Sequence, residues 1–128
     1  MAACKILVVD DDDDIRDSLI GLFRGEGVTA EGAKSGVAAL AMLTWGQFAP
    51  DVILLDLLMP SMSGDQFRSV VQRHPLWSRI PIIVCTAGHL PDPAQVGAFG
   101  VMQKPFDVEQ LLSLVKRACQ ASLPAAPP

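Results

Sequence analysis

The feature that most constrains the fold is a short apolar run, Val-Ile-Leu-Leu at residues 52–55, which leads into Asp56 and is followed by Pro60. A continuous apolar run of this length, bounded by turn residues, is typical of a strand buried on both faces of a parallel sheet. Ionisable groups are rarely left inside such sheets, so we expect Asp56 at the carboxyl end of the strand. Ligands of open α/β sheets bind at that end.

Similar apolar runs recur along the chain and alternate with segments of helical periodicity. Strands are expected at residues 4–9, 28–33, 52–55, 80–86 and 101–103. Helices are expected after the aspartates at 10–14, from Ser35 to about Trp45, from Gly64 to about His74, and from Asp107 onward. Between the last two strands, Pro91 and Pro93 leave room for only about two helical turns, so the fourth helix is shortened. The alternation predicts a doubly wound, five-stranded parallel α/β sheet.

Each expected helix carries an apolar face at helical spacing, which we expect to be buried. The four faces comprise Ile15, Leu19, Leu22 and Phe23; Val37, Leu40 and Ala41; Phe67, Val70 and Val71; and Val108, Leu111, Leu112, Val115 and Cys119. Ser35 and Asp107 are expected to cap the helices that follow them.

Composition narrows the class of protein. The chain has 128 residues, half of them hydrophobic and 19% charged, which is typical of one globular domain. A net charge of −4 gives no sign of the basic surface that would bind nucleic acid or an anionic membrane. No apolar run is long enough to span a membrane. We expect the domain to cover residues 1–121 and residues 122–128 to form a Pro/Ala-rich tail or linker.

The number and spacing of the cysteines indicate whether the protein is expected in a reducing or an oxidising cellular compartment. None of Cys4, Cys85 and Cys119 has metal-ligand spacing, and three cysteines cannot all pair. We expect three reduced, mostly buried thiols in a cytoplasmic protein, with Cys85 a core residue and not a nucleophile.

Polar groups stand where the expected strands end: Asp10 and Asp11, Asp56, Thr86, and Lys104. The carboxyl ends of parallel strands share one edge, so these groups can share a pocket. Three carboxylates repel one another, and a hard divalent cation relieves that repulsion; Mg²⁺ suits a site of few carboxylates. A lysine and a hydroxyl nearby suit an incoming phosphoryl group, for which the carboxylate would be the nucleophile.

Five motifs in this order resemble the receiver domains of two-component response regulators, over about residues 4–120. The motifs are Val8-Val9-Asp10-Asp11, Leu55-Asp56, Met59-Pro60, Thr86-Ala87 and Lys104-Pro105-Phe106. The resemblance implies a flavodoxin-like fold with strand order 2-1-3-4-5. It also implies a phosphorylatable signalling switch and not an enzyme with a separate substrate.

The resemblance assigns roles residue by residue. Asp56 would accept the phosphoryl group from a histidine of a sensor kinase or histidine phosphotransfer protein. Mg²⁺, or Mn²⁺ in its place, would bind Asp11, Asp56 and the backbone carbonyl of Leu58, with Asp10 acting through a water. Lys104, expected before a cis Pro105, would pair with the phosphoryl group, and Thr86 with the Ala87 N–H would move toward it. An output partner or domain is implied but not identified, and a homodimer is left open.

Two departures bear on signal output. Val101 stands where the family usually has Tyr or Phe, and the prolines fall where the fourth helix belongs. Two alternatives therefore stay open: an interaction module that no longer depends on phosphorylation, and an aspartyl-nucleophile phosphohydrolase. The second would normally need another Asp where this chain has Leu58. Outside the motifs, Asp12, Asp13 and Asp14 are expected to be surface and capping residues.

Overall fold

The structure is a computed structural model that describes residues 4–46, 48–57, 62, 64–88 and 90–122. It contains one parallel sheet with strand order β2-β1-β3-β4-β5, which confirms the predicted fold class and order. The strands are β1 (Lys5–Val9), β2 (Thr29–Ala33), β3 (Val52–Asp56), β4 (Ile82–Thr86) and β5 (Gly100–Gln103).

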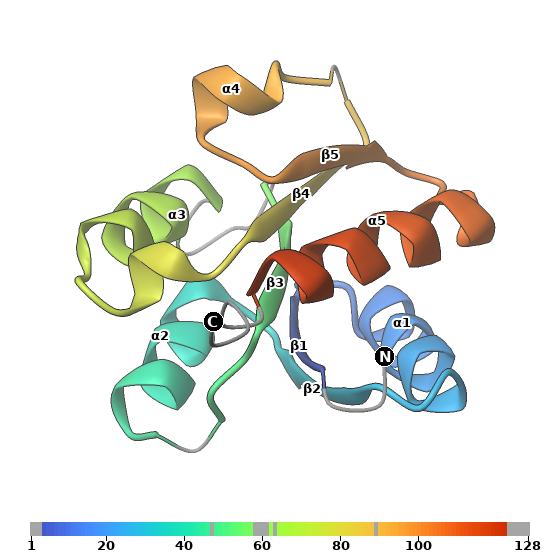
Figure 1. Cartoon of the computed structure of the whole chain (residues 1–128), viewed down its shortest axis with the longest axis horizontal. Helices are drawn as coiled ribbons and strands as arrows, with labels where there is room; N and C mark the ends of the chain where they lie inside the picture. Colours follow the sequence, from blue (N-terminus) through green and yellow to red (C-terminus); the bar gives the residue numbers. More distant parts are fainter. Residues whose placement is uncertain (1–3, 47, 58–61, 63, 89, 123–128) are drawn as a thin grey trace, which may run out of the picture.

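Helices cover both faces of this sheet (Figure 1). The helices α1 (Asp13–Gly25) and α5 (Val108–Ser122) lie on one face, and α2 (Gly36–Thr44) and α3 (Gly64–Arg73) lie on the other. A 3₁₀ turn, η1 (Trp77–Arg79), precedes β4 and was not predicted. The remaining helix, α4 (Pro93–Val96), is a single turn beside β5, so the predicted shortening is confirmed.

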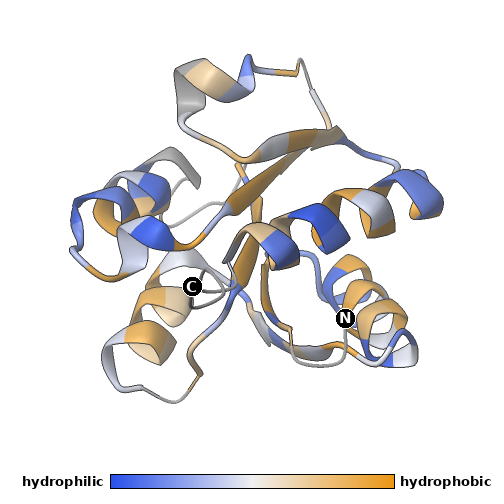
Figure 2. Ribbon diagram, in the orientation of Figure 1, coloured by the Kyte–Doolittle hydropathy of each residue, from blue (hydrophilic) through white to orange (hydrophobic). Residues whose placement is uncertain are grey.

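The period of two along each strand divides the core into two layers. In β1 and β3, Ile6, Val8, Val52 and Leu54 point toward α1 and α5, whereas Leu7, Val9, Ile53 and Leu55 point toward α2 and α3. All eight side chains are buried, which explains why β1 and β3 are continuous apolar runs without alternation. Figure 2 shows apolar strands at the centre and hydrophilic residues on α3 and α5 around them.

The strand register aligns the carboxyl ends along one edge. Val9 pairs with Leu55, Asp56 with Cys85, and Thr86 with Gln103. The residues that follow these strands, Asp10 and Lys104 among them, therefore leave the sheet at the same edge as Asp56.

Three of the predicted helix faces are wrong in part, and in α2 both Val37 and Ala41 are exposed. Val37, Val70 and Val108 are 55%, 41% and 50% exposed, although each was expected to be buried. In α2, whose residues are apolar nearly all round, Ala39 and Leu43 are buried instead, because a helix without a polar face does not reveal by sequence which side meets the sheet. Both predicted caps are confirmed: Ser35 accepts the N–H of Ala38, and Asp107 accepts that of Gln110.

The prediction of three reduced thiols is also wrong. Cys4 and Cys119 form a disulfide, with their Cα atoms 5.9 Å apart and a separation of 115 positions in sequence. Cys4 stands directly before β1, and α5 packs on the same face of the sheet as the side chains that Cys4 joins, so the fold brings the two ends of the domain together. Cys85 is a free, buried thiol, as expected.

The C-terminal helix α5 runs to Ser122, one residue past the predicted end of the domain. Residues 123–128 of the predicted tail lie outside the described residues. Within the described part of the chain, no helix combines the length and the apolar character needed to cross a membrane.

Candidate functional site

Asp10 and Asp11 reach the sheet edge because β1 ends at Val9 and α1 begins only at Asp13. The Asp10 N–H donates to the carbonyl of Ala33 in β2 (3.1 Å), which extends the ladder by one residue. Asp12 is the N-cap of α1, and its carboxylate accepts the N–H of Ile15 (3.0 Å). The capping role predicted for Asp12 is therefore confirmed, and it leaves Asp10 and Asp11 in the connection between strand and helix.

The carboxylates of Asp10, Asp11 and Asp56 converge, and we call these three residues the acidic cluster. One oxygen from each lies within 4.8 Å of the other two. Asp10 is 3% and Asp56 6% exposed, whereas Asp11 lies open to solvent. The sequence thus predicted the meeting of these groups, but not the difference in their burial.

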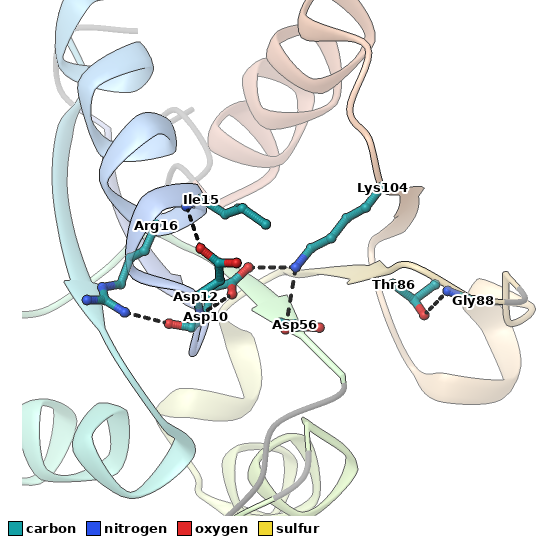
Figure 3. A network of polar contacts seen from close by, with 8 residues as sticks. All are labelled: Asp10, Asp12, Ile15, Arg16, Asp56, Thr86, Gly88 and Lys104. Atoms are coloured by element: carbon teal, nitrogen blue, oxygen red, sulfur yellow. Dashed lines mark hydrogen bonds and ion pairs between the residues drawn. The ribbon is translucent and has the colours of Figure 1, made fainter.

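Lys104 joins the acidic cluster from the end of β5 (Figure 3). Its ammonium donates to Asp10 Oδ2 at 2.8 Å and lies 3.4 Å from Asp56 Oδ2. Burial lowers the pKa of Lys104, but the hydrogen bond to Asp10 and the charges of Asp10 and Asp56 outweigh it, so this pKa is raised above its ordinary value. The ammonium therefore stays charged at neutral pH. The Lys104-Pro105 peptide bond is cis, as the resemblance implied.

The hydroxyl of Thr86 points away from the acidic cluster. This buried hydroxyl accepts the N–H of Gly88 at 3.1 Å, and Figure 3 shows it pointing toward Gly88 and not toward Asp56. Ala87, whose N–H was assigned a role beside Thr86, is exposed. Leu58, whose carbonyl was expected to bind the metal, lies outside the described residues.

The sequence interpretation missed Arg16. From α1 its guanidinium donates to the carbonyl of Asp10 at 2.8 Å and pairs with Asp13. The spacing from Asp13 to Arg16 does predict an ion pair on a helix. Nothing in the sequence indicates that the same side chain reaches the backbone beside the acidic cluster.

The acidic cluster has the oxygen ligands that a hard divalent cation requires. Three carboxylates against one ammonium leave an excess of negative charge, and two of the carboxylates are nearly buried. Oxygen ligands with few carboxylates fit Mg²⁺ better than a soft metal. The only free cysteine of the described residues, Cys85, is buried in β4, and burial raises the pKa of its thiol far above the ordinary range, so it is neither a ligand nor a nucleophile here.

The chain is similar to known proteins along most of its length. The family model described as "Response regulator receiver domain" matches residues 6–116. The DNA-binding transcriptional regulator NtrC of Salmonella typhimurium is 39% identical over 118 residues, which are 88% of this chain and 24% of that protein. Protein Rrf1 of Nitratidesulfovibrio vulgaris is 37% identical, with 89% of this chain and 81% of that protein covered.

A solved structure of the chemotaxis protein CheY4 of Vibrio cholerae superimposes with a TM-score of 0.80 at 33% identity, covering 90% of this chain and 98% of that one. The chain therefore spans nearly the whole of the CheY4 chain in that structure but only about a quarter of the length of NtrC.

Proposed function

The chain belongs to the response regulator receiver domain family of two-component systems, and we propose that it is a phosphorylatable switch whose phosphoacceptor is Asp56. The single observation that carries this proposal is the convergence of Asp10, Asp11 and Asp56 on the ammonium of Lys104. A nucleophilic carboxylate, an acidic site for a cation and a fixed positive charge are what phosphoryl transfer to an aspartate requires.

In the proposed reaction, an oxygen of Asp56 attacks the phosphorus of a partner's phosphohistidine. The bond from phosphorus to the imidazole nitrogen breaks, and an acyl phosphate forms. Lys104 would stabilise charge on the transferred oxygens, and the distance of 3.4 Å between its ammonium and Asp56 supports this role. Thr86, which holds Gly88 in this structure, would exchange that hydrogen bond for one to the phosphoryl group, and the Ala87 N–H would donate a second.

Asp11 and Asp56 would hold Mg²⁺ directly, together with the carbonyl of Leu58, and Asp10 would act through a water. Mn²⁺ would substitute. The bound cation would supply positive charge that offsets the repulsion between the carboxylates and the incoming phosphoryl group.

The phosphoryl donor is a sensor histidine kinase or a histidine phosphotransfer protein, and the phosphorylated state is read by an output partner or domain. We propose a cytoplasmic location, where such kinases present their phosphohistidine. The acidic net charge of the chain gives no reason to propose direct contact with nucleic acid or a membrane. Residues 1–121 are proposed as the switch and 122–128 as a tail or linker.

The test is intact-mass measurement after incubation with phosphoramidate and Mg²⁺, with Asp56→Asn as the matched control. We expect the mass to rise by one phosphoryl group in the wild type and to stay unchanged in Asp56→Asn or with a chelator present. A folded wild-type protein that binds Mg²⁺ and takes up no phosphoryl group would refute the proposal and favour an interaction module independent of phosphorylation.

A further inference from the structure

We infer that Arg16 is a positioning residue for the acidic cluster, and that Gly32 leaves the space that the side chain of Arg16 occupies. This inference rests on the proposed function, because it concerns the readiness of the acidic cluster to bind Mg²⁺. The contact of Arg16 with the acidic cluster is to the backbone carbonyl of Asp10 and not to a carboxylate. Arg16 acts through the backbone of Asp10.

The contacts of Arg16 tie the start of α1 to the end of β1. One guanidinium nitrogen, Nη1, donates to the carbonyl oxygen of Asp10 at 2.8 Å, and the other, Nη2, pairs with the carboxylate of Asp13. The Arg16 side chain is only 15% exposed and that of Asp13 is 78% exposed, so the bond to the Asp10 carbonyl is better shielded from water than the pair with Asp13. In Figure 3, Arg16 and Lys104 approach Asp10 from opposite sides.

The Asp10 carbonyl matters because it belongs to the peptide group that joins Asp10 to Asp11. That group is planar, so a bond that fixes its C=O also fixes the direction in which the chain enters Asp11. The side chain of Asp10 is held separately, since Oδ1 accepts the N–H of Asp12 at 2.9 Å and Oδ2 accepts Lys104. Asp11 is exposed, and its orientation depends on its backbone more than on packing.

Gly32 makes this arrangement sterically feasible. It lies in β2 opposite Val8, and a Cβ there would stand 2.9 Å from Arg16 Cδ and 2.7 Å from Ile20 Cδ1. Both distances are shorter than van der Waals contact, so alanine at this position must displace the stem of Arg16. Gly32 is not in a left-handed conformation, so space and not backbone geometry favours glycine here.

The inferred role of Arg16 depends on the shape of its guanidinium as well as on its positive charge. A lysine would keep the positive charge beside the acidic cluster, but its single ammonium lacks the planar fork that reaches the Asp10 carbonyl and the Asp13 carboxylate together. Arg16→Lys therefore keeps the positive charge near the acidic cluster but loses the contacts that position the peptide group between Asp10 and Asp11.

The experiment is a Mg²⁺ titration of the full chain followed by ¹H–¹⁵N NMR, which reports both the metal affinity and the backbone amides of Asp11 and Asp12 before metal is added. The variants are Arg16→Met, which keeps the apolar stem, Arg16→Lys and Gly32→Ala. Arg24→Met is the matched control, because Arg24 also lies in α1 and donates to a backbone carbonyl, that of Ala30, away from the acidic cluster. Gly21→Ala is the control for Gly32, since a Cβ at Gly21 meets no atom within 4 Å.

We expect all three test variants to bind Mg²⁺ about tenfold more weakly, as is usual when a residue that orients a ligand is lost. The amides of Asp11 and Asp12 should shift in the metal-free test variants and stay in place in both controls. The inference would be overturned if Arg16→Met or Arg16→Lys bound Mg²⁺ with the affinity of the wild type. It would also be overturned if Arg24→Met lost as much Mg²⁺ affinity as Arg16→Met.

The two readouts separate this inference from the proposed function. If the wild type binds no Mg²⁺, the proposed function fails, and the metal-free amides still decide whether Arg16 orients Asp11. If the wild type binds Mg²⁺ and Arg16→Met binds it equally well, the proposed function stands and the inference is refuted.

Discussion

At the scale of single residues, the positive charge of Lys104 offsets part of the negative charge of Asp10 and Asp56. Its ammonium lies 2.8 Å from one carboxylate and 3.4 Å from the other, with only 14% of its side chain exposed. Opposite charges at such distances and low exposure interact strongly, because little water lies between them. Lys104 therefore both stabilises the acidic cluster without metal and opposes the binding of a cation to it.

This double role predicts opposite effects for Lys104→Met. Loss of the ammonium should tighten Mg²⁺ binding by about tenfold, or about 1.4 kcal/mol, because the carboxylates are left uncompensated. Uptake of a phosphoryl group from phosphoramidate should slow by about 10²–10³-fold, because a charge aimed at the transferred oxygens is removed. Calorimetric Mg²⁺ titration and intact-mass kinetics measure the two effects.

The control for this prediction is Lys116→Met, which removes an exposed lysine from α5. It should change neither Mg²⁺ affinity nor uptake rate. Unchanged Mg²⁺ affinity in Lys104→Met would show that Lys104 does not oppose the cation.

At the scale of elements, α1 and α5 form an apolar groove that begins at the site. The groove has a volume of about 510 Å³, and Lys104 and Asp14 lie at its border. Its walls include Ile15, Leu22, Phe106 and Val108. In the proposed reaction, a phosphohistidine comes within bonding distance of Asp56, so its protein would cover this edge of the sheet. We propose that the phosphohistidine-bearing partner occupies the groove.

The exposed valine Val108 tests this surface. Val108→Gln places an uncharged amide in the groove and leaves the charges of the site unchanged. Transfer from a protein donor should fall by about tenfold, because burying an unpaired amide costs about 1–3 kcal/mol. Uptake from phosphoramidate should not change, because that donor needs no groove. The protein donor is whichever phosphorylated kinase or phosphotransfer protein of the same organism transfers fastest to the wild type.

Val37→Gln is the matched control, since Val37 is an equally exposed valine in the first turn of α2, outside the groove. It should leave both rates unchanged. An equal loss of transfer in the two valine variants would place the partner elsewhere.

At the scale of the whole molecule, the disulfide between Cys4 and Cys119 joins the two ends of the domain. Cys4 precedes β1 and Cys119 lies in α5, so the bond links the first strand of the chain to the last helix. A cross-link between residues far apart in sequence removes many conformations from the unfolded chain.

We therefore expect reduction, or Cys119→Ser, to lower the free energy of unfolding by about 2–5 kcal/mol. Denaturant unfolding with and without reductant measures the difference. In Cys119→Ser the reductant should have no further effect, because Cys85 is unpaired. Equal stability of the wild type with and without reductant would contradict the prediction.

Much of this molecule was predictable because its signals are local. The apolar runs at β1, β3 and β4 predicted buried strands, since a strand covered on both faces needs apolar residues at every position. The prolines near α4 predicted its shortening. The parallel sheet then implied that Asp10, Asp11, Asp56 and Lys104 meet at one edge, and the structure brings these four together. Their proposed roles stay predictions.

Other features depended on contacts between segments that sequence patterns do not relate. Which side of the apolar helix α2 faces the sheet, and thus the exposure of Val37, follows only from packing. The pairing of Cys4 with Cys119 and the reach of Arg16 to the carbonyl of Asp10 each depend on two elements meeting in space. The sequence by itself determined which residues end the strands, through local propensity and periodicity. Only the tertiary structure decided which side chains hold those ends in place, because such contacts follow from how helices pack on the sheet.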